Sequence, residues 1–327
     1  MQTAQETIQS AQLKPEAPVV SVVIPAYNCA GFIGETLDSV FAQTFSGYEV
    51  IVINDGSPDT PELERVLEPY RERIVYLRQS NRGPGAARNA GIRRARGEYV
   101  ALIDSDDQWL PQFLSEQLRA LQNDPALDLI YADALFFGDS QLAGQTFMSA
   151  TPSRGPVNFE SLLNWQCVVL LSTVVARRQA LIDGGLFDEE FYRCEDFALW
   201  LRMAHRGMRL GYQPKVLARY RCRPDSLSAS STRMFASEIE VLRLIERTCA
   251  LSSARHRLLI AAKNRCQAAV DLEQGKQQLL AGDYRSALET LNRAVALRKN
   301  LKLRLAVLGL QIAPGLLRRA YKLRYSL

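Results

Sequence analysis

Runs of apolar, mostly β-branched residues alternate with segments of helical periodicity over the first third of the chain. The four runs are Val19–Ile24, Val50–Ile53, Ile74–Leu77 and Tyr99–Ile103. A short apolar run with little polar alternation is typical of a strand buried on both faces of a parallel sheet. Strands that alternate with helices form βαβ units. The sequence therefore predicts an α/β fold with a mostly parallel sheet.

Length and composition allow one large α/β domain and a smaller appendage. The 327 residues are 47% hydrophobic and 23% charged, which is ordinary for a globular protein. Six scattered cysteines without a Cys-x-x-Cys pair indicate a reducing compartment and argue against structural zinc. Residues 1–17 lack the apolar core of a signal peptide, and we expect a disordered arm there. No uncharged apolar stretch reaches the roughly 18 residues that a membrane span needs. These features predict a cytoplasmic protein.

Three carboxylates follow the fourth apolar run directly, in the stretch Asp104-Ser105-Asp106-Asp107. The carboxyl ends of strands are where open α/β sheets bind their ligands. Asp104 and Asp106, one residue apart in a turn, can face one small, hard cation, which binds through one or two carboxylates plus substrate phosphates. The alternative is an acidic first turn that caps the next helix. The motif alone does not separate these two interpretations.

Polar side chains also end two earlier strands, at Tyr27 and Asp55. Several polar side chains at the ends of strands along one sheet edge indicate a binding pocket there. The sequence contains no Gly-x-x-x-x-Gly-Lys-Ser/Thr loop, and no Gly-x-Gly-x-x-Gly follows the first strand. We therefore expect a nucleotide whose phosphates are held by a metal ion, and no dinucleotide cofactor.

The second half of the chain adds a further acidic pair. Leu171–Arg178 is predicted to be a strand that runs into a helix, Gly184–Glu189 a turn, and Cys194–Ala204 a helix. Glu195 and Asp196 lie at the start of this last helix, where its dipole stabilises negative charge. Capping and catalysis are both open interpretations of this pair.

Together these motifs resemble glycosyltransferase family 2, the inverting GT-A-fold enzymes that use nucleotide sugars. The matching segments, which span about residues 18–228 in the family's order, are Val19–Asn28, Val52–Ser57, Asn81–Gly83, Ala86–Gly91, Gly97–Asp107, Gly185–Glu189 and Glu195–Asp196. The resemblance implies a Rossmann-like GT-A domain over residues 18–232, with a mostly parallel sheet and helices on both faces. An α-helical C-terminal extension follows this domain.

The resemblance also implies roles for particular residues. Residues expected to contact the nucleotide, usually a uridine diphosphate, are Pro25, Ala26, Tyr27, Asp55, Arg88, Asp104, Ser105 and Arg223. Asp55 would accept hydrogen bonds from the base, and Asp104 and Asp106 would hold Mg²⁺ or Mn²⁺ on the diphosphate. Asp196, beside Glu195, would be the general base that deprotonates the acceptor hydroxyl.

One residue departs from the family pattern. The family often ends its domain with Tyr-Arg-x-His-x-x-Ser-x-Ser, and this chain has Arg223 where the His is expected. Arginine does not ligate a metal, but it pairs with phosphate in a bidentate fashion. We therefore predict that Arg223 stabilises the leaving diphosphate.

The remaining residues are predicted to be helical. Within 233–300, residues 268–297 resemble a single tetratricopeptide repeat without its closing proline, which is interpreted as an ordinary helical hairpin or as a protein-binding module. The tail, residues 301–327, is basic and amphipathic, and no acidic residue follows Glu289. Peripheral contact with an anionic membrane and docking on the protein are its two interpretations. No basic-aromatic motif indicates nucleic acid as a partner.

The sequence as a whole predicts an inverting, metal-dependent glycosyltransferase. It would move a sugar from a nucleotide-diphosphate donor, with UDP-sugars favoured, to a hydroxyl of a cell-surface glycan or lipid-linked acceptor. Acceptor specificity is expected to lie in residues 133–170, where Asp133–Gly155 shows little periodicity and is interpreted as a loop-rich acceptor wall. A nucleotidyltransferase is disfavoured, because residues 25–34 carry no basic side chain for a triphosphate. The alternative from another class is a non-catalytic scaffold built on a GT-A domain.

Overall fold

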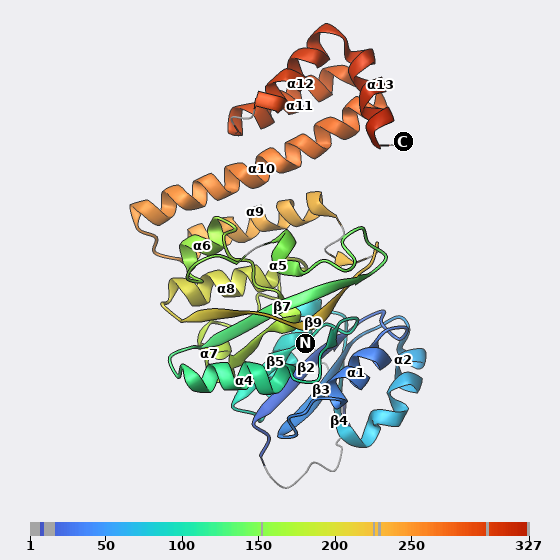
Figure 1. Cartoon of the computed structure of the whole chain (residues 1–327), viewed down its shortest axis with the longest axis vertical. Coiled ribbons are helices and arrows are strands. Elements are labelled where there is room, and N and C mark those ends of the chain that lie inside the picture. The colour runs from blue at the N-terminus through green and yellow to red at the C-terminus, as the bar shows by residue number, and fades with distance from the viewer. Residues whose placement is uncertain are drawn as a thin grey trace, which may run out of the picture. The chain divides into compact units, whose positions relative to one another are not determined.

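The computed structural model describes residues 7–9, 17–151, 153–224, 226–227, 230–298 and 301–325. The chain divides into two compact units, residues 1–229 and 230–327, which are drawn in Figure 1. Helix α9 begins at Ser231, so residues 231 and 232, which the sequence assigned to the first domain, lie in a helix of the second unit.

The first half of unit 1 alternates strands and helices as predicted. Its elements are β2 (Val20–Ala26), α1 (Ile33–Phe41), β3 (Tyr48–Asp55), α2 (Thr60–Leu67), η1 (Glu68–Arg73), β4 (Ile74–Gln79), α3 (Pro84–Arg94) and β5 (Tyr99–Leu102). Helix α3 starts with a proline, which suits the first helical position because its missing N–H needs no partner there.

The second half of unit 1 is less regular. Its elements are β6 (Gln108–Trp109), α4 (Phe113–Asn123), β7 (Leu129–Gly138), α5 (Phe147–Ala150), α6 (Phe159–Leu163), η2 (Leu171–Thr173), β8 (Val175–Arg177), α7 (Arg178–Asp183), α8 (Glu195–His205) and β9 (Leu210–Cys222). The strand predicted from residue 171 begins with the 3₁₀ turn η2, so only its last part is extended.

One mixed, curled sheet joins the strands of unit 1 in the order β1-β4-β3-β2-β5-β8-β7-β9-β6. Strands β4, β3, β2 and β5 are mutually parallel, as are β7 and β9. Strands β1, β6 and β8 pair antiparallel with their neighbours. The predicted α/β class with a mostly parallel central sheet is confirmed.

Helices cover both faces of this sheet. On one face Val22 and Val52 pack in a core with Leu37 of α1 and Phe113 of α4. On the other face α3 approaches the sheet at Gly91. A Cβ added there would come within 2.5 Å of Val23 Cγ1, so only glycine permits this approach.

The N-terminal arm needs one correction. Thr7–Gln9 form strand β1, antiparallel to β4, so the expected disorder does not hold for these three residues. The rest of residues 1–16 lies outside the described part of the chain.

Unit 2 is helical, as predicted. It comprises α9 (Ser231–Thr248), α10 (Ser253–Ala281), α11 (Tyr284–Leu297), α12 (Leu301–Ile312) and α13 (Pro314–Tyr325). Helices α10 and α11 form the expected hairpin, turning at Gly282 (φ +91°), with Asp283 capping α11. A core cluster joins α11 to α12 through Leu291, Leu303 and Val307. Among the described residues, no helix is long and apolar enough to cross a membrane.

Candidate active site

The candidate site lies where three parallel strands end. In the order β3-β2-β5 the carboxyl ends share one sheet edge, so the residues that follow them are neighbours. These residues are Tyr27 after β2, Asp55 at the end of β3, and Asp104 just after β5. Ligand sites of open α/β sheets occupy this edge.

Asp55 is buried and holds the loop that leads into α3. Its Oδ1 accepts hydrogen bonds from Gln79 Nε2 (2.8 Å) and Arg82 N (2.9 Å), and its Oδ2 accepts one from Gly83 N (2.8 Å). This carboxylate therefore fixes the loop geometry. Any contact with a nucleobase would use its remaining lone pairs.

Two exposed tyrosines flank this loop. Tyr27 is 44% exposed and Tyr192 is 45% exposed. A Cβ on Gly83 would come within 3.2 Å of Tyr192 Cδ2, so the Tyr192 ring lies directly against the loop. Partial burial, together with nearby Tyr27 and Asp55, raises the pKa of Tyr192. No sequence pattern indicates Tyr192 as a site residue, because it lies in an irregular segment before α8.

Arg88 of α3 connects the carboxylates of two other segments. Its Nη2 is 2.7 Å from Asp104 Oδ1, after β5, and its Nη1 is 2.5 Å from Glu195 Oε1, at the start of α8. The side chains of Arg88 and Glu195 are only 6% and 8% exposed. Burial alone would lower the pKa of Arg88, but the charges of Asp104 and Glu195 outweigh it. Arg88 is therefore a buried cation between two carboxylates.

Asp106 and Asp107 carry negative charge that is poorly compensated. Burial and the charge of Asp104 raise the pKa of Asp106 to about 6, although Arg223 Nη1 lies 3.3 Å from its Oδ2. Burial and the two neighbouring carboxylates raise the pKa of Asp107 too. Its Oδ1 accepts a hydrogen bond from Arg221 N (2.7 Å), while its buried Oδ2 has no hydrogen-bond partner among the described residues.

Asp196 lies beside Glu195 and differs from it in environment. Its Oδ1 accepts a hydrogen bond from Phe197 N at 2.7 Å. Burial, followed by the charge of Glu195, raises the pKa of Asp196 to about 7. A carboxylate with a pKa near neutrality is suited to proton transfer. Glu195, paired with Arg88, is not free for that task.

The acidic side chains of the site can be compared with the ligands that the expected divalent cation needs. Among the described residues, no three or more His, Cys, Asp or Glu are grouped to hold a metal ion. Mg²⁺ needs no such group when one or two carboxylates and a substrate diphosphate supply its ligands. Asp104 and Asp106 fit this arrangement, because a cation would offset the repulsion that raises the pKa of Asp106.

The structure brings most of the predicted site residues together. Asp104, Arg88 and Glu195 form one linked group, and Asp106 pairs with Arg223. Pro25 and Ala26 end β2 at the same edge. Ser105 lies between Asp104 and Asp106 in the turn that follows β5. Their chemical roles stay predictions.

The expected loop-rich acceptor wall is wrong in its first part. Residues 133–138 belong to strand β7, and short helices α5 and α6 interrupt the segment that follows. The pairing register with β9 shifts at Asp133, where the extra residues lie in β9, and Asp133 Oδ1 accepts a hydrogen bond from Met148 N (2.9 Å). This polar residue interrupts the apolar run of residues 129–137, which explains why the strand gave no sequence signal.

Comparison with solved structures assigns the class of fold. Residues of this chain superpose on Staphylococcus aureus TarS 1-349 in complex with UDP with a TM-score of 0.60, 22% identity, and coverage of 94% of this chain and 92% of that one. The mannosyltransferase PcManGT from Pyrobaculum calidifontis, solved with GDP-Man and Mn²⁺, gives a TM-score of 0.62 at 19% identity, covering 96% and 86%. The fold is therefore that of the GT-A glycosyltransferases.

Sequence relatives assign the family. The model of glycosyl transferase family 2 matches residues 21–168. The putative teichuronic acid biosynthesis glycosyltransferase TuaG of Bacillus subtilis is 30% identical over 70% of this chain and 89% of its own length. The chain belongs to glycosyltransferase family 2.

Two further sequence relatives show how far the similarity extends. The Escherichia coli UDP-Glc:alpha-D-GlcNAc-diphosphoundecaprenol beta-1,3-glucosyltransferase WfaP is 28% identical over 69% of this chain and 86% of its own. An uncharacterized glycosyltransferase of Rickettsia felis is 32% identical over 57% of this chain, but that match spans only 31% of the Rickettsia protein.

We predict that Arg88→Met destabilises the protein by about 3 kcal/mol, because it leaves Asp104 and Glu195 as uncompensated charges. Urea unfolding of both variants and the parent protein measures the effect. The matched control is Arg65→Met, which removes an exposed ion pair with Glu62 and should cost less than about 1 kcal/mol. Equal effects of the two substitutions would contradict the structural importance of the Arg88 bridge.

Proposed function

We propose that this protein is an inverting, metal-dependent glycosyltransferase that uses a nucleotide-diphosphate sugar, with UDP-sugars favoured. The observation that supports the proposal most directly is the Arg88 bridge between Asp104 and Glu195. It holds the candidate cation ligands and the candidate base, Asp196, in one site. A sugar transfer needs both at once.

The donor side of this site suits a diphosphate bound with a cation. Asp104 and Asp106 would hold Mg²⁺ or Mn²⁺, which stabilises the negative charge of a departing diphosphate. Arg223, 3.3 Å from Asp106, is placed to pair with phosphate oxygens beside that cation. Tyr27, Tyr192 and the loop held by Asp55 would surround the base. Similar folds in complex with UDP and with GDP-Man and Mn²⁺ are consistent with such a donor.

On the acceptor side, Asp196 would remove the proton from the attacking hydroxyl. Its pKa of about 7 allows it to accept a proton near neutral pH. Glu195 would act as a positioning residue, because its bond to Arg88 fixes the first turn of α8. One base on one face, with no second carboxylate acting as a nucleophile, leads to inversion at the anomeric carbon.

The proposed acceptor is a hydroxyl of a lipid-diphosphate-linked precursor of a cell-surface polysaccharide. WfaP, by its name, acts on a diphosphoundecaprenol-linked sugar, and TuaG is assigned to teichuronic acid biosynthesis. We place the reaction on the cytoplasmic side of a membrane, which agrees with six cysteines that are all free.

Unit 2 offers a surface for peripheral membrane contact. One face of α12 is buried through Leu303, Val307 and Leu310, so docking within the unit accounts for that face. The opposite side of α12 stays exposed and apolar, with exposed fractions of 49–74% at Leu301, Leu305, Leu308 and Ile312. Helix α13 adds two exposed leucines, Leu316 and Leu323. Only basic charges accompany these residues, because no acid follows Glu289. An anionic lipid surface complements both properties.

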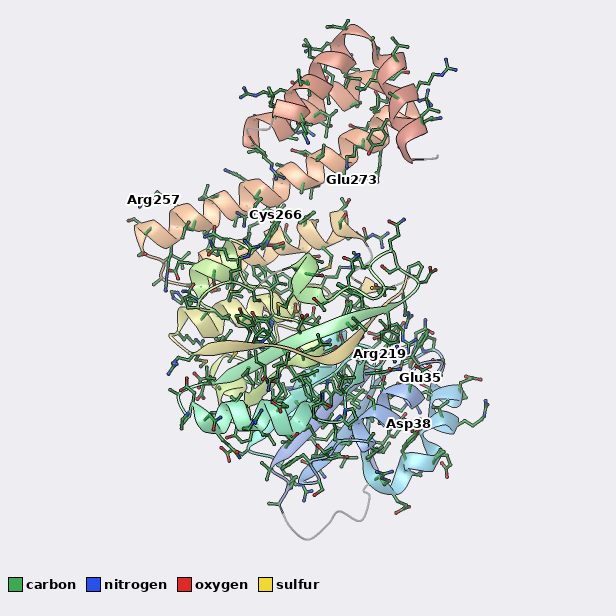
Figure 2. The ribbon with its side chains drawn as sticks, viewed as in Figure 1. Glu35, Asp38, Arg219, Arg257, Cys266 and Glu273 are labelled. Atoms are coloured by element: carbon green, nitrogen blue, oxygen red, sulfur yellow. The ribbon has the colours of Figure 1, made fainter. Side chains whose placement is uncertain are left out.

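The donor proposal predicts metal-dependent binding of one nucleoside diphosphate. Titration calorimetry with UDP, GDP, CDP and dTDP, with and without Mn²⁺, should show one preferred nucleotide whose affinity falls at least tenfold without the cation. Asp104→Ala/Asp106→Ala should lose the metal dependence. Asp38→Ala, at an exposed carboxylate of α1 (Figure 2), is the matched control. A folded protein that binds none of the four would favour the scaffold alternative.

Activity should depend on the ionisation of Asp196. Because a general base acts in its deprotonated form, kcat/KM should rise with pH up to about 7 and level off above it. UDP release from the preferred donor gives the profile. Asp196→Asn should lower kcat by about 10²–10⁴-fold with the affinity for the nucleotide retained. A pH-independent rate between 5 and 8 (roughly the range where such a base titrates) would contradict this role.

The membrane proposal predicts that the full-length protein floats with vesicles containing phosphatidylglycerol at low salt. Flotation should weaken at high salt, because surface electrostatics are screened. Leu305→Ser/Ile312→Ser should reduce it strongly, whereas Leu142→Ser, at an exposed leucine of unit 1, should not. Equal flotation of all three proteins would show that the tail is not the contact.

A further inference from the structure

Three arginines and two phenylalanines form a continuous stack at the end of β9. Arg219, Arg221 and Arg223 alternate along the chain and therefore share one face of an extended segment. We call the stack that they form with Phe32 and Phe137 the arginine ladder. The guanidinium of Arg219 lies 4.5 Å from the Phe137 ring centroid and that of Arg221 4.4 Å from it. The guanidinium groups of Arg221 and Arg223 lie 5.1 and 4.2 Å from the Phe32 centroid.

Each aromatic ring thus lies between two cations. Stacking on a ring satisfies the face of a guanidinium and leaves its N–H edge free to bind anions. The stack also fixes the side-chain rotamers, so less conformational entropy is lost when an anion binds. An arrangement of this kind is unusual for charges that only keep a surface soluble.

The ladder carries more positive charge than its neighbours neutralise. Arg221 pairs with Glu35 at 2.6 Å, and Arg223 pairs with Asp106. Arg219 is exposed and donates to the neutral Gln108 Oε1 at 3.0 Å, and no carboxylate lies within ion-pair distance of it among the described residues. Figure 2 shows Arg219 and Glu35 on the same side of unit 1. The cation at the outer end of the ladder is therefore available to a ligand.

We propose that the outer part of the arginine ladder, Arg219 and Arg221, is a second anion site, separate from the donor diphosphate at Arg223, and that it binds the diphosphate of the lipid-linked acceptor. The choice of this ligand rests on the proposed function. The ladder's inner end, Arg223, adjoins Asp106 and the donor site. Its outer end is four residues further along the strand, roughly 13 Å at about 3.3 Å per residue. This separation leaves room for a sugar of the acceptor between the reacting hydroxyl and the phosphates at Arg219 and Arg221.

The test measures binding of a soluble prenyl diphosphate. Geranyl diphosphate is titrated into full-length protein saturated with UDP and excess Mg²⁺, so that the donor site is already filled. We expect one further binding event that geraniol does not reproduce. Arg219→Gln should weaken it about tenfold, the loss expected when one charged hydrogen-bonding group is removed. Phe137→Leu should weaken it as well, because both flanking guanidinium groups lose their stacking partner.

Controls separate this proposal from the preceding one. Arg257→Gln, at an exposed arginine of α10 (Figure 2), should not change geranyl diphosphate binding. Arg219→Lys keeps the positive charge but lacks the planar pair of N–H donors of a guanidinium. Its affinity for geranyl diphosphate should lie between those of the parent and Arg219→Gln. UDP affinity is measured in every variant. If the parent protein does not bind UDP, that result counts against the proposed function and not against the ladder proposal. Equal affinity of the parent and Arg219→Gln for geranyl diphosphate, or displacement of that ligand by UDP, would overturn the ladder proposal.

Discussion

The ion pairs of Arg88 are the interaction on which the arrangement of the site depends. A nearly inaccessible guanidinium is stable only with charged partners, and its two partners, Asp104 and Glu195, come from different segments. The end of β5 and the start of α8 are far apart in the sequence, and this residue of α3 links them directly. The candidate site and the fold of unit 1 therefore share this contact, so its loss should affect both.

The depth at which Arg88 lies follows from a close approach of backbone. Gly91, one turn after Arg88, lets α3 contact Val23 and Ile53 of the sheet, at distances that any side chain would prevent. Asn89, on the same helix, donates to the carbonyl oxygen of Phe187 and accepts from its N–H, tying α3 to the turn before α8. Helix α3 thus connects the sheet and α8, and its small residues matter as much as its charged one.

The parts of the fold that follow from local periodicity could be predicted, and those that depend on distant contacts could not. The apolar runs of β2, β3, β4 and β5 were evident because each strand is buried on both faces. Strand β7 was missed because the polar Asp133 interrupts its apolar run. For the site, carboxylates at strand ends identified the edge. Tyr192, Arg219 and Arg221 could not be recognised as site residues from the sequence, because their neighbours are distant in the chain. The fold places Gly83 beside Tyr192. It places Phe137 beside Arg219 and Phe32 beside Arg221.

The charge balance of the site supports the proposal that a donor diphosphate binds here together with a cation. Burial, and then the charges of neighbouring carboxylates, raise the pKa values of Asp106, Asp107 and Asp196. Arg88 pairs with two of these carboxylates through Nη1 and Nη2, and Arg223 faces a third. A bare diphosphate would add negative charge to an acidic cluster. A divalent cation would neutralise the charge of Asp104 and Asp106, so nucleotide and cation should increase each other's affinity by the same factor.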